Sequence, residues 1–221
     1  IFLLIIGAFQ AIALVLLLLV KRDKGVADYI LSGYLFVSAL IIVFAYLEIW
    51  NRNLGYPYPW LINLSTPLIL VVGPALWFYV KSLTDQHFRF KTLYSLTLIP
   101  FVVVLAMLLA RHYLQPEALK IANEQSEDFK KDFAFYIIVA MIALSNLGYI
   151  LWGLLLIKRY RQKLKTYFSR TDTIDLAWLR FLLISALICY MCISGLYIVD
   201  SLVELVNYAT LQLIGFSIAA V

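Results

Sequence analysis

The segment KRYRQKLKTYFSRTDTIDLAWLR, Lys158 to Arg180, is a dense run of positive charge between two long apolar stretches. It contains seven of the 18 Lys and Arg residues of the chain. In membrane proteins, Lys and Arg concentrate in the connections on the cytoplasmic side. The segment therefore predicts which side of a membrane this part of the chain faces, and it orients the apolar stretches around it.

The rest of the composition is that of an integral membrane domain. Of 221 residues, 64% are hydrophobic and only 14% are charged. Seven apolar stretches are long enough to cross about 30 Å of hydrocarbon as helices. Helices are expected because every backbone polar group must be paired within its own segment. We expect one domain over 1–221, an all-α bundle of seven transmembrane helices at roughly 1–20, 28–50, 61–82, 93–113, 133–158, 176–199 and 202–221.

The charges of the connections predict the orientation of this bundle. Odd-numbered connections hold 12 Lys and Arg residues and even-numbered ones hold five, the latter mixed with acidic residues. The N-terminus is therefore expected outside, and the chain after Val221 inside. Because the chain begins at Ile1 and ends within an apolar stretch, we expect it to belong to a longer protein. The polar fourth connection predicts an outer loop with a short helix beginning at Pro116.

Six basic residues of the opening segment form what we call the basic collar, at the inner membrane surface. Anionic lipid headgroups are its expected partner, because juxtamembrane basic clusters are attracted to the negative surface potential of the membrane. Nucleic acid is the alternative partner for such a mixture of charge and aromatic residues. The collar consists of Lys158, Arg159, Arg161, Lys163, Lys165 and Arg170.

Polar residues near the ends of four helices gather on the predicted outer side. Ionisable groups in or near a bilayer are costly, so they mark candidate functional sites. Together with Tyr56, Tyr58 and Trp60 they predict an outward-opening pocket for a small molecule. Solvation of each group among lipid headgroups is the alternative. The candidate ligand-sensing residues are Glu48, Asn63, Thr66, Asp200, Glu204 and Asn207.

Residues deeper in the apolar stretches predict packing rather than chemistry. Gln10, Asn146 and Gln212 are expected to pair helices through hydrogen bonds. Pro74 and Pro100 predict kinks, because proline removes a backbone hydrogen bond. The cysteines at positions 189 and 192 lie on a stripe of small residues that favours close helix packing.

Several chemistries are not expected from this sequence. No lysine lies in the core of an apolar stretch, which argues against a retinal Schiff base. No HExxH, Gly-rich phosphate loop or GxSxG pattern occurs in the chain. We therefore predict no catalytic residues, no metal ligands, no cofactor and no enzymatic activity.

Four short motifs, in this order and spacing, resemble the N-terminal seven-helix domain of membrane-bound AraC-type transcriptional regulators of Bacteroidetes-like bacteria. They are GAFQAIALVLLLL (Gly7 to Leu19), PLILVVGPALWFYVKSL (Pro67 to Leu83), IPF (Ile99 to Phe101) and DLAWLRFLL (Asp175 to Leu183). The family often has a histidine before the LIPF run, where this chain has Thr97, which puts any role of that site in doubt. The resemblance covers essentially the whole chain.

The resemblance implies a sensor and anchor in the bacterial inner (cytoplasmic) membrane. In that family a helix-turn-helix domain follows the last span in the cytoplasm, so DNA would be contacted only by a domain outside these residues. Two-fold DNA sites would favour a homodimer. The ligand is not predicted. A sensor domain of a histidine kinase and a small seven-helix transporter are the alternative functions.

Overall fold

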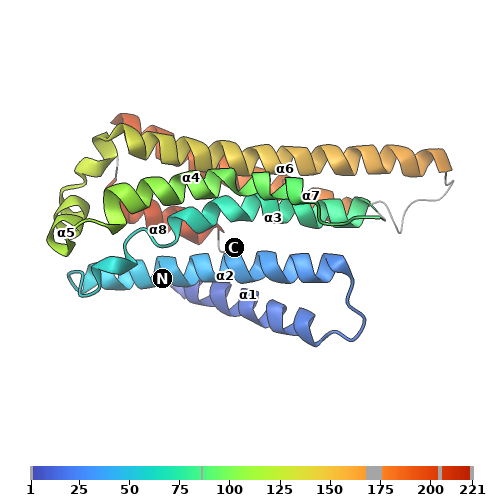
Figure 1. Ribbon diagram of the computed structural model, residues 1–221, viewed down its shortest axis with the longest axis horizontal. Helices are drawn as coiled ribbons and strands as arrows, with labels where there is room; N and C mark the ends of the chain where they lie inside the picture. The colour runs from blue at the N-terminus through green and yellow to red at the C-terminus, as the bar shows by residue number, and fades with distance from the viewer. Residues whose placement is uncertain (1, 86, 168–175, 204–205, 220–221) are drawn as a thin grey trace.

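The computed structural model describes residues 2–85, 87–167, 176–203 and 206–219, with the side chains of these residues except 128, 165–167 and 201–203. Helices dominate this part of the chain, and it contains no strand. The longer helices run side by side in one elongated bundle (Figure 1). The all-α class is therefore confirmed for the described residues.

Eight α-helices make up the described bundle, together with three short 3₁₀ segments and one π-helical turn. Helix α4 (Ile99–Leu108) is preceded by the 3₁₀ segment Thr92–Leu98 and followed by the π-helical turn Leu109–Tyr113. The α-helices are α1 (Phe2–Val20), α2 (Val26–Asn53), α3 (Thr66–Thr84), α4 (Ile99–Leu108), α5 (Glu117–Ser126), α6 (Phe133–Tyr167), α7 (Ala177–Val203) and α8 (Tyr208–Ala219).

Six segments of the described chain are long and apolar enough to cross a membrane. They agree with the first six predicted stretches. Their length and composition are those of a multi-pass membrane protein. The seventh predicted stretch, 202–221, is represented by α8, which has 12 described residues. A helix of that length is short of the roughly 20 residues that a span requires. Seven crossings and their orientation therefore remain predictions.

Helix α3 is the central element of the bundle. It packs against α2 on one side and against α6 on the other, and α6 in turn packs against α7. Its apolar stretch is the most buried of the six. A core cluster joins α3, α6 and α7 through Leu76, Tyr79, Val80, Ile150, Ile157, Leu179 and Leu183.

Asn146 and Gly73 set the close approach of α3 and α6. Asn146 is fully buried, and its Nδ2 donates to the carbonyl of Ile69 at 3.3 Å. A Cβ on Gly73 would lie 2.9 Å from Asn146 Oδ1 and 3.1 Å from its Cα, so only glycine allows this spacing. The predicted interhelical role of Asn146 is confirmed. Gln10, in contrast, is exposed on α1.

The prolines differ in their effect on the helices. Pro74 lies inside α3, as expected. Pro100 is the second residue of α4, in the first turn, where a missing N–H leaves no hydrogen bond unmade. Pro100 thus lies at the change from 3₁₀ to α-helix within the span Thr92–Tyr113, and a kink there stays a prediction.

Several helix boundaries also differ from the predictions. Helix α6 does not end at residue 158 but continues to Tyr167, so the collar residues up to Lys165 are helical. Helix α7 continues to Val203, three residues beyond Asp200. The predicted short helix of the fourth connection is confirmed as α5, which follows Pro116 directly.

Candidate functional site

The connections gather at two opposite ends of the bundle. The α2–α3 loop, α5, the last turn of α7 and the first turn of α8 lie at one end, and the α1–α2 loop, the last turn of α3 and the C-terminal turns of α6 lie at the other (Figure 1). We call the first the acidic end and the second the basic end. The candidate site lies at the acidic end, where α5 covers the bundle.

The α2–α3 loop is shaped by one buried asparagine. Asn51 is fully buried, its Nδ2 donates to the carbonyl of Tyr58 at 2.9 Å, and its Oδ1 accepts from the Tyr58 N–H at 2.8 Å. Two residues of this loop adopt left-handed backbone, Tyr56 with φ 64° and Asn63 with φ 61°. This conformation is uncommon outside glycine, and asparagine tolerates it best among the others. It directs both side chains toward the site.

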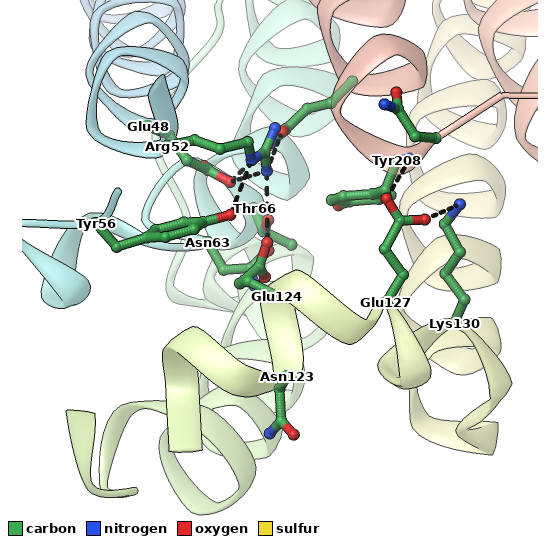
Figure 2. A network of polar contacts seen from close by, with 12 residues as sticks. Glu48, Arg52, Tyr56, Asn63, Thr66, Asn123, Glu124, Glu127, Lys130 and Tyr208 are labelled. Atoms are coloured by element: carbon green, nitrogen blue, oxygen red, sulfur yellow. Dashed lines mark hydrogen bonds and ion pairs between the residues drawn. The ribbon is translucent and has the colours of Figure 1, made fainter. Parts of the chain in front are cut away.

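Arg52 is the centre of the polar network at the acidic end (Figure 2). Its Nη2 donates to Gln212 Oε1 at 3.1 Å and to Glu124 Oε2 at 3.4 Å, and it lies 3.7 Å from Glu48 Oε1. Its Nε donates to the hydroxyl of Tyr56 at 3.2 Å. One guanidinium thus joins three separate elements, α2, α5 and α8.

Glu48 is the most buried carboxyl group of the network. Its side chain is 1% exposed, and Oε1 accepts a hydrogen bond of 2.9 Å from Gln212 Nε2. Its other oxygen, Oε2, has no hydrogen-bond partner among the described residues. A buried carboxylate oxygen without a donor within hydrogen-bond distance is costly, since it has lost its water.

Glu124 connects the cap helix α5 to the rest of the site. Its side chain is 4% exposed, and besides Arg52 it accepts a 3.5 Å hydrogen bond from Asn63 Nδ2. Burial raises the pKa of Glu124 above its ordinary value of 4.5, while Arg52 acts in the opposite direction. Asn63 is held in turn by Thr66, whose Oγ1 donates to Asn63 Oδ1 at 3.2 Å.

The π-helical turn after α4 brings one more side chain to this network. The hydroxyl of Tyr113 donates to the carbonyl of Asn63 at 2.9 Å. Such turns often occur at functional sites because they shift the residues that follow them on the helix. Tyr113 thereby helps to hold Asn63, whose side chain donates to Glu124.

A second polar cluster lies beside the first (Figure 2). Lys130 Nζ is 2.8 Å from Glu127 Oε2 and 3.4 Å from Asp200 Oδ2 of α7. Glu127 Oε1 accepts the backbone N–H of Tyr208, the first residue of α8, at 2.9 Å. The first turn of α8 is therefore tied to the residue that ends α5.

The structure brings together some of the predicted sensing residues and separates others. Glu48, Asn63 and Thr66 belong to the Arg52 network, and Asp200 belongs to the Lys130 cluster. Asn207 is exposed, and its Oδ1 caps α8 by accepting the Thr210 N–H at 3.0 Å. Glu204 lies outside the described residues.

The predicted pocket is filled by its own side chains in this structure. The polar groups bond to one another, and Tyr58 and Trp60 point outward with 48% and 58% exposure. A cavity of about 40 Å³ lies beside Lys130 and Asp200. The larger groove, about 450 Å³, lies between α4 and α6 and is lined mainly by apolar residues, away from the network.

Sequence reasoning missed the residues that hold the site together. Arg52, Glu124, Glu127 and Lys130 were interpreted only as loop charges that set orientation. The available signal was the spacing of Lys120, Glu124 and Glu127, which places three charged residues on one face of a short helix. Gln212 was predicted to pair helices, and this is confirmed by its bonds to Glu48 and Arg52 of α2.

The basic collar lies at the opposite end of the molecule from the network. Lys158, Arg159 and Lys163 are exposed on the last turns of α6, and Arg161 is half-buried. The side chain of Lys165, like Arg170, lies outside the described part of the chain. The described side chains include no group of three or more residues placed to hold a metal ion.

Comparisons with known proteins give no relative for this chain. No protein-family model, no curated protein and no solved structure matches it. The function is therefore argued from the site itself.

Proposed function

We propose that this chain is the sensor and anchor domain of a transcriptional regulator in the inner membrane of a bacterium. In this proposal seven helices cross the membrane, with the acidic end outside and the basic end in the cytoplasm. A helix-turn-helix DNA-binding domain would follow α8 on the cytoplasmic side. The signal would be received at the acidic end and passed inward along the helices.

One observation supports this proposal more than any other. The outer cap α5 is joined through buried charged groups to α8, the helix that leads toward the expected output domain. Ionisable groups at membrane depth are rare and costly, and they are retained mainly for function. A signal that changes the contacts of α5 would therefore change the position of α8 as well, since both depend on Arg52 and Glu127.

Such coupling requires two arrangements of the helices with different affinities for the signal. The Arg52 network would allow a second arrangement, because its bonds join separate elements and can be exchanged for bonds to water. The core of α3, α6 and α7 would stay fixed, because it is held by apolar packing. The proposal thus assigns movement to α5 and α8 and rigidity to the central helices.

The test begins with the coding sequence after Val221. Helix-turn-helix residues there would support the proposal, and the core of a histidine kinase would replace it with the alternative from the same signalling class. The next step is transcript profiling of a deletion strain complemented with wild type, Arg52→Gln or Lys21→Gln. We expect Lys21→Gln to restore the wild-type transcript pattern and Arg52→Gln to alter it. Equal patterns in both variants would contradict a sensing role of the network.

A further inference from the structure

The most buried side chains of α5 are charged, and its one half-buried apolar side chain is Ile121. Lys120 and Glu124 are buried against the bundle, whereas Leu119, on another face, is 52% exposed. Helices usually turn their apolar face inward, and burial of that face holds them at any pH. Because the side chains that α5 buries most deeply are Lys120 and Glu124, its docking depends on the charge state of the groups beneath it.

The docked α5 adds a second carboxyl group, Glu124, to a guanidinium that already has Glu48 beside it on α2. Glu124 and Glu48 both lie within 4.0 Å of Arg52 Nη2. The other side chains bonded to these three residues, Gln212, Asn63 and Tyr56, carry no charge at neutral pH. Lys120, one turn earlier on α5, forms no ion pair within 4.0 Å with any carboxylate of the described residues.

The neighbouring cluster is built in the same way around Lys130. Glu127 and Asp200 share Lys130, so two carboxyl groups again meet one cation. In the docked arrangement each of these two cations, Arg52 and Lys130, therefore has two carboxyl groups within 4.0 Å. Two carboxylates that share a site favour retention of a proton by one of them.

Glu48 gives an independent reason to place a proton here. Its Oε2 is unpartnered within the described structure, and its side chain is 1% exposed. An ionised carboxylate in that position would be poorly solvated. A proton bound to the pair removes this cost and leaves one carboxylate for Arg52.

We propose that Glu48 and Glu124 form a proton-binding site that keeps α5 closed, and that α5 opens when a rise in outer pH removes the proton. On opening, Glu124 moves into water and Glu48 keeps Arg52 as its partner. The link between Glu127 and the N–H of Tyr208 is released in the same movement, which frees the first turn of α8. This inference rests on the proposed sensing function and names its signal as outer pH.

The direction of the effect follows from proton linkage. Burial raises the pKa of Glu124 in the docked helix, whereas in water the group has its ordinary value of 4.5. The closed form therefore binds protons more tightly than the open form. Rising pH above that ordinary value favours opening, and falling pH favours closure.

Hydrogen exchange of the α5 amides measures this opening directly. The protein is reconstituted in lipid nanodiscs, and exchange is followed between about pH 5 and about pH 8, with rates divided by the intrinsic chemical rate at each pH. In wild type we expect the protection of α5 and of the first turn of α8 to fall with rising pH, by up to about tenfold per pH unit if one proton is released per opening. Protection of α3 should stay constant.

Three variants make the test specific. Glu124→Gln and Glu48→Gln each remove one ionisable carboxyl group, so either should keep α5 protected across the whole pH range. Glu117→Gln, in the exposed first turn of the same helix, should retain the wild-type pH dependence. Constant protection of α5 in wild type would overturn the proposal, as would an unchanged pH dependence in both Glu124→Gln and Glu48→Gln.

Transcript profiling of the complemented deletion strains, extended to Glu124→Gln and Glu48→Gln, separates this inference from the proposed function. If α5 opens with pH but transcripts do not respond, the proton site stands and the regulatory role fails. If transcripts depend on Arg52 but α5 protection is independent of pH, the regulatory role stands and the proton site fails.

Discussion

Replacement of Arg52 by glutamine tests the energetics of the buried network. The side chain of Arg52 is 15% exposed, and its two carboxylate neighbours, Glu48 and Glu124, are 1% and 4% exposed. Removing one partner of a buried ion pair typically costs about 3–5 kcal/mol, because the remaining charge stays buried without compensation. In Arg52→Gln two carboxyl groups lose their cation, so we expect a loss of about 3 kcal/mol or more at neutral pH.

Lys21→Gln is the matched control for this variant. Lys21 is ion-paired with Asp28 at 2.8 Å, but the two side chains are 49% and 20% exposed. Exposed ion pairs contribute about 0–1 kcal/mol, so the free energy of unfolding of this variant should be close to that of wild type. The two replacements remove one positive charge each and differ mainly in burial.

Reversible denaturation of the protein in mixed micelles, followed by tryptophan fluorescence, measures both losses. The loss in Arg52→Gln should shrink as the pH falls, because protonation neutralises the two carboxyl groups that the variant leaves unpaired. A loss in Arg52→Gln no larger than in Lys21→Gln would refute the argument. A loss that grows toward low pH would refute it as well.

Two further predictions concern the helix contact of α3 with α6 and the acid stability of the acidic end. Gly73→Ala should destabilise the protein by about 1–3 kcal/mol in the same denaturation assay, because the added Cβ would meet Asn146. The control Gly33→Ala, which has open space around it, should be neutral or slightly stabilising. Equal effects of the two replacements would contradict the close contact of α3 and α6. The Ala134 N–H and the guanidinium of Arg111 donate hydrogen bonds to Asp132 and lower its pKa below the usual 3.8. The stability that ionised Asp132 provides is therefore present above pH 3.8 and is lost as the pH falls through the lowered pKa. Asp132→Asn should therefore lose less stability than wild type on acidification below that value, and an unchanged acid profile would count against this ion pair.

The helical class and the positions of most spans were predictable because they depend on composition and length alone. Apolar runs of about 20 residues can cross a bilayer only as helices, whatever their neighbours. Asn146 and Gln212 were also predicted as interhelical residues, since an amide in an apolar stretch favours a partner, but the same reasoning was applied to Gln10, which is exposed on α1. The end of α6 was not predictable in this way, since the bilayer sets no limit on a helix once it has left the membrane.

The centre of the site could not be predicted, because it depends on contacts between distant segments. Arg52 and Glu124 are 72 residues apart, and Arg52 and Gln212 are 160 residues apart. A charged residue near the end of an apolar stretch has the same sequence pattern whether it is later buried under another segment or stays in water. Only the position of α5 over the bundle distinguishes the two.

The central claim of this account is that the acidic end of the bundle faces outward and the basic end faces the cytoplasm. Labelling of intact cells with a membrane-impermeant maleimide tests it most directly. Single cysteines would replace Asn123, exposed on α5, or Lys163, exposed on the last turns of α6, after the two native cysteines have been changed to alanine. The account predicts labelling at position 123 and labelling at position 163 only after the cells are opened; the reverse pattern would contradict it.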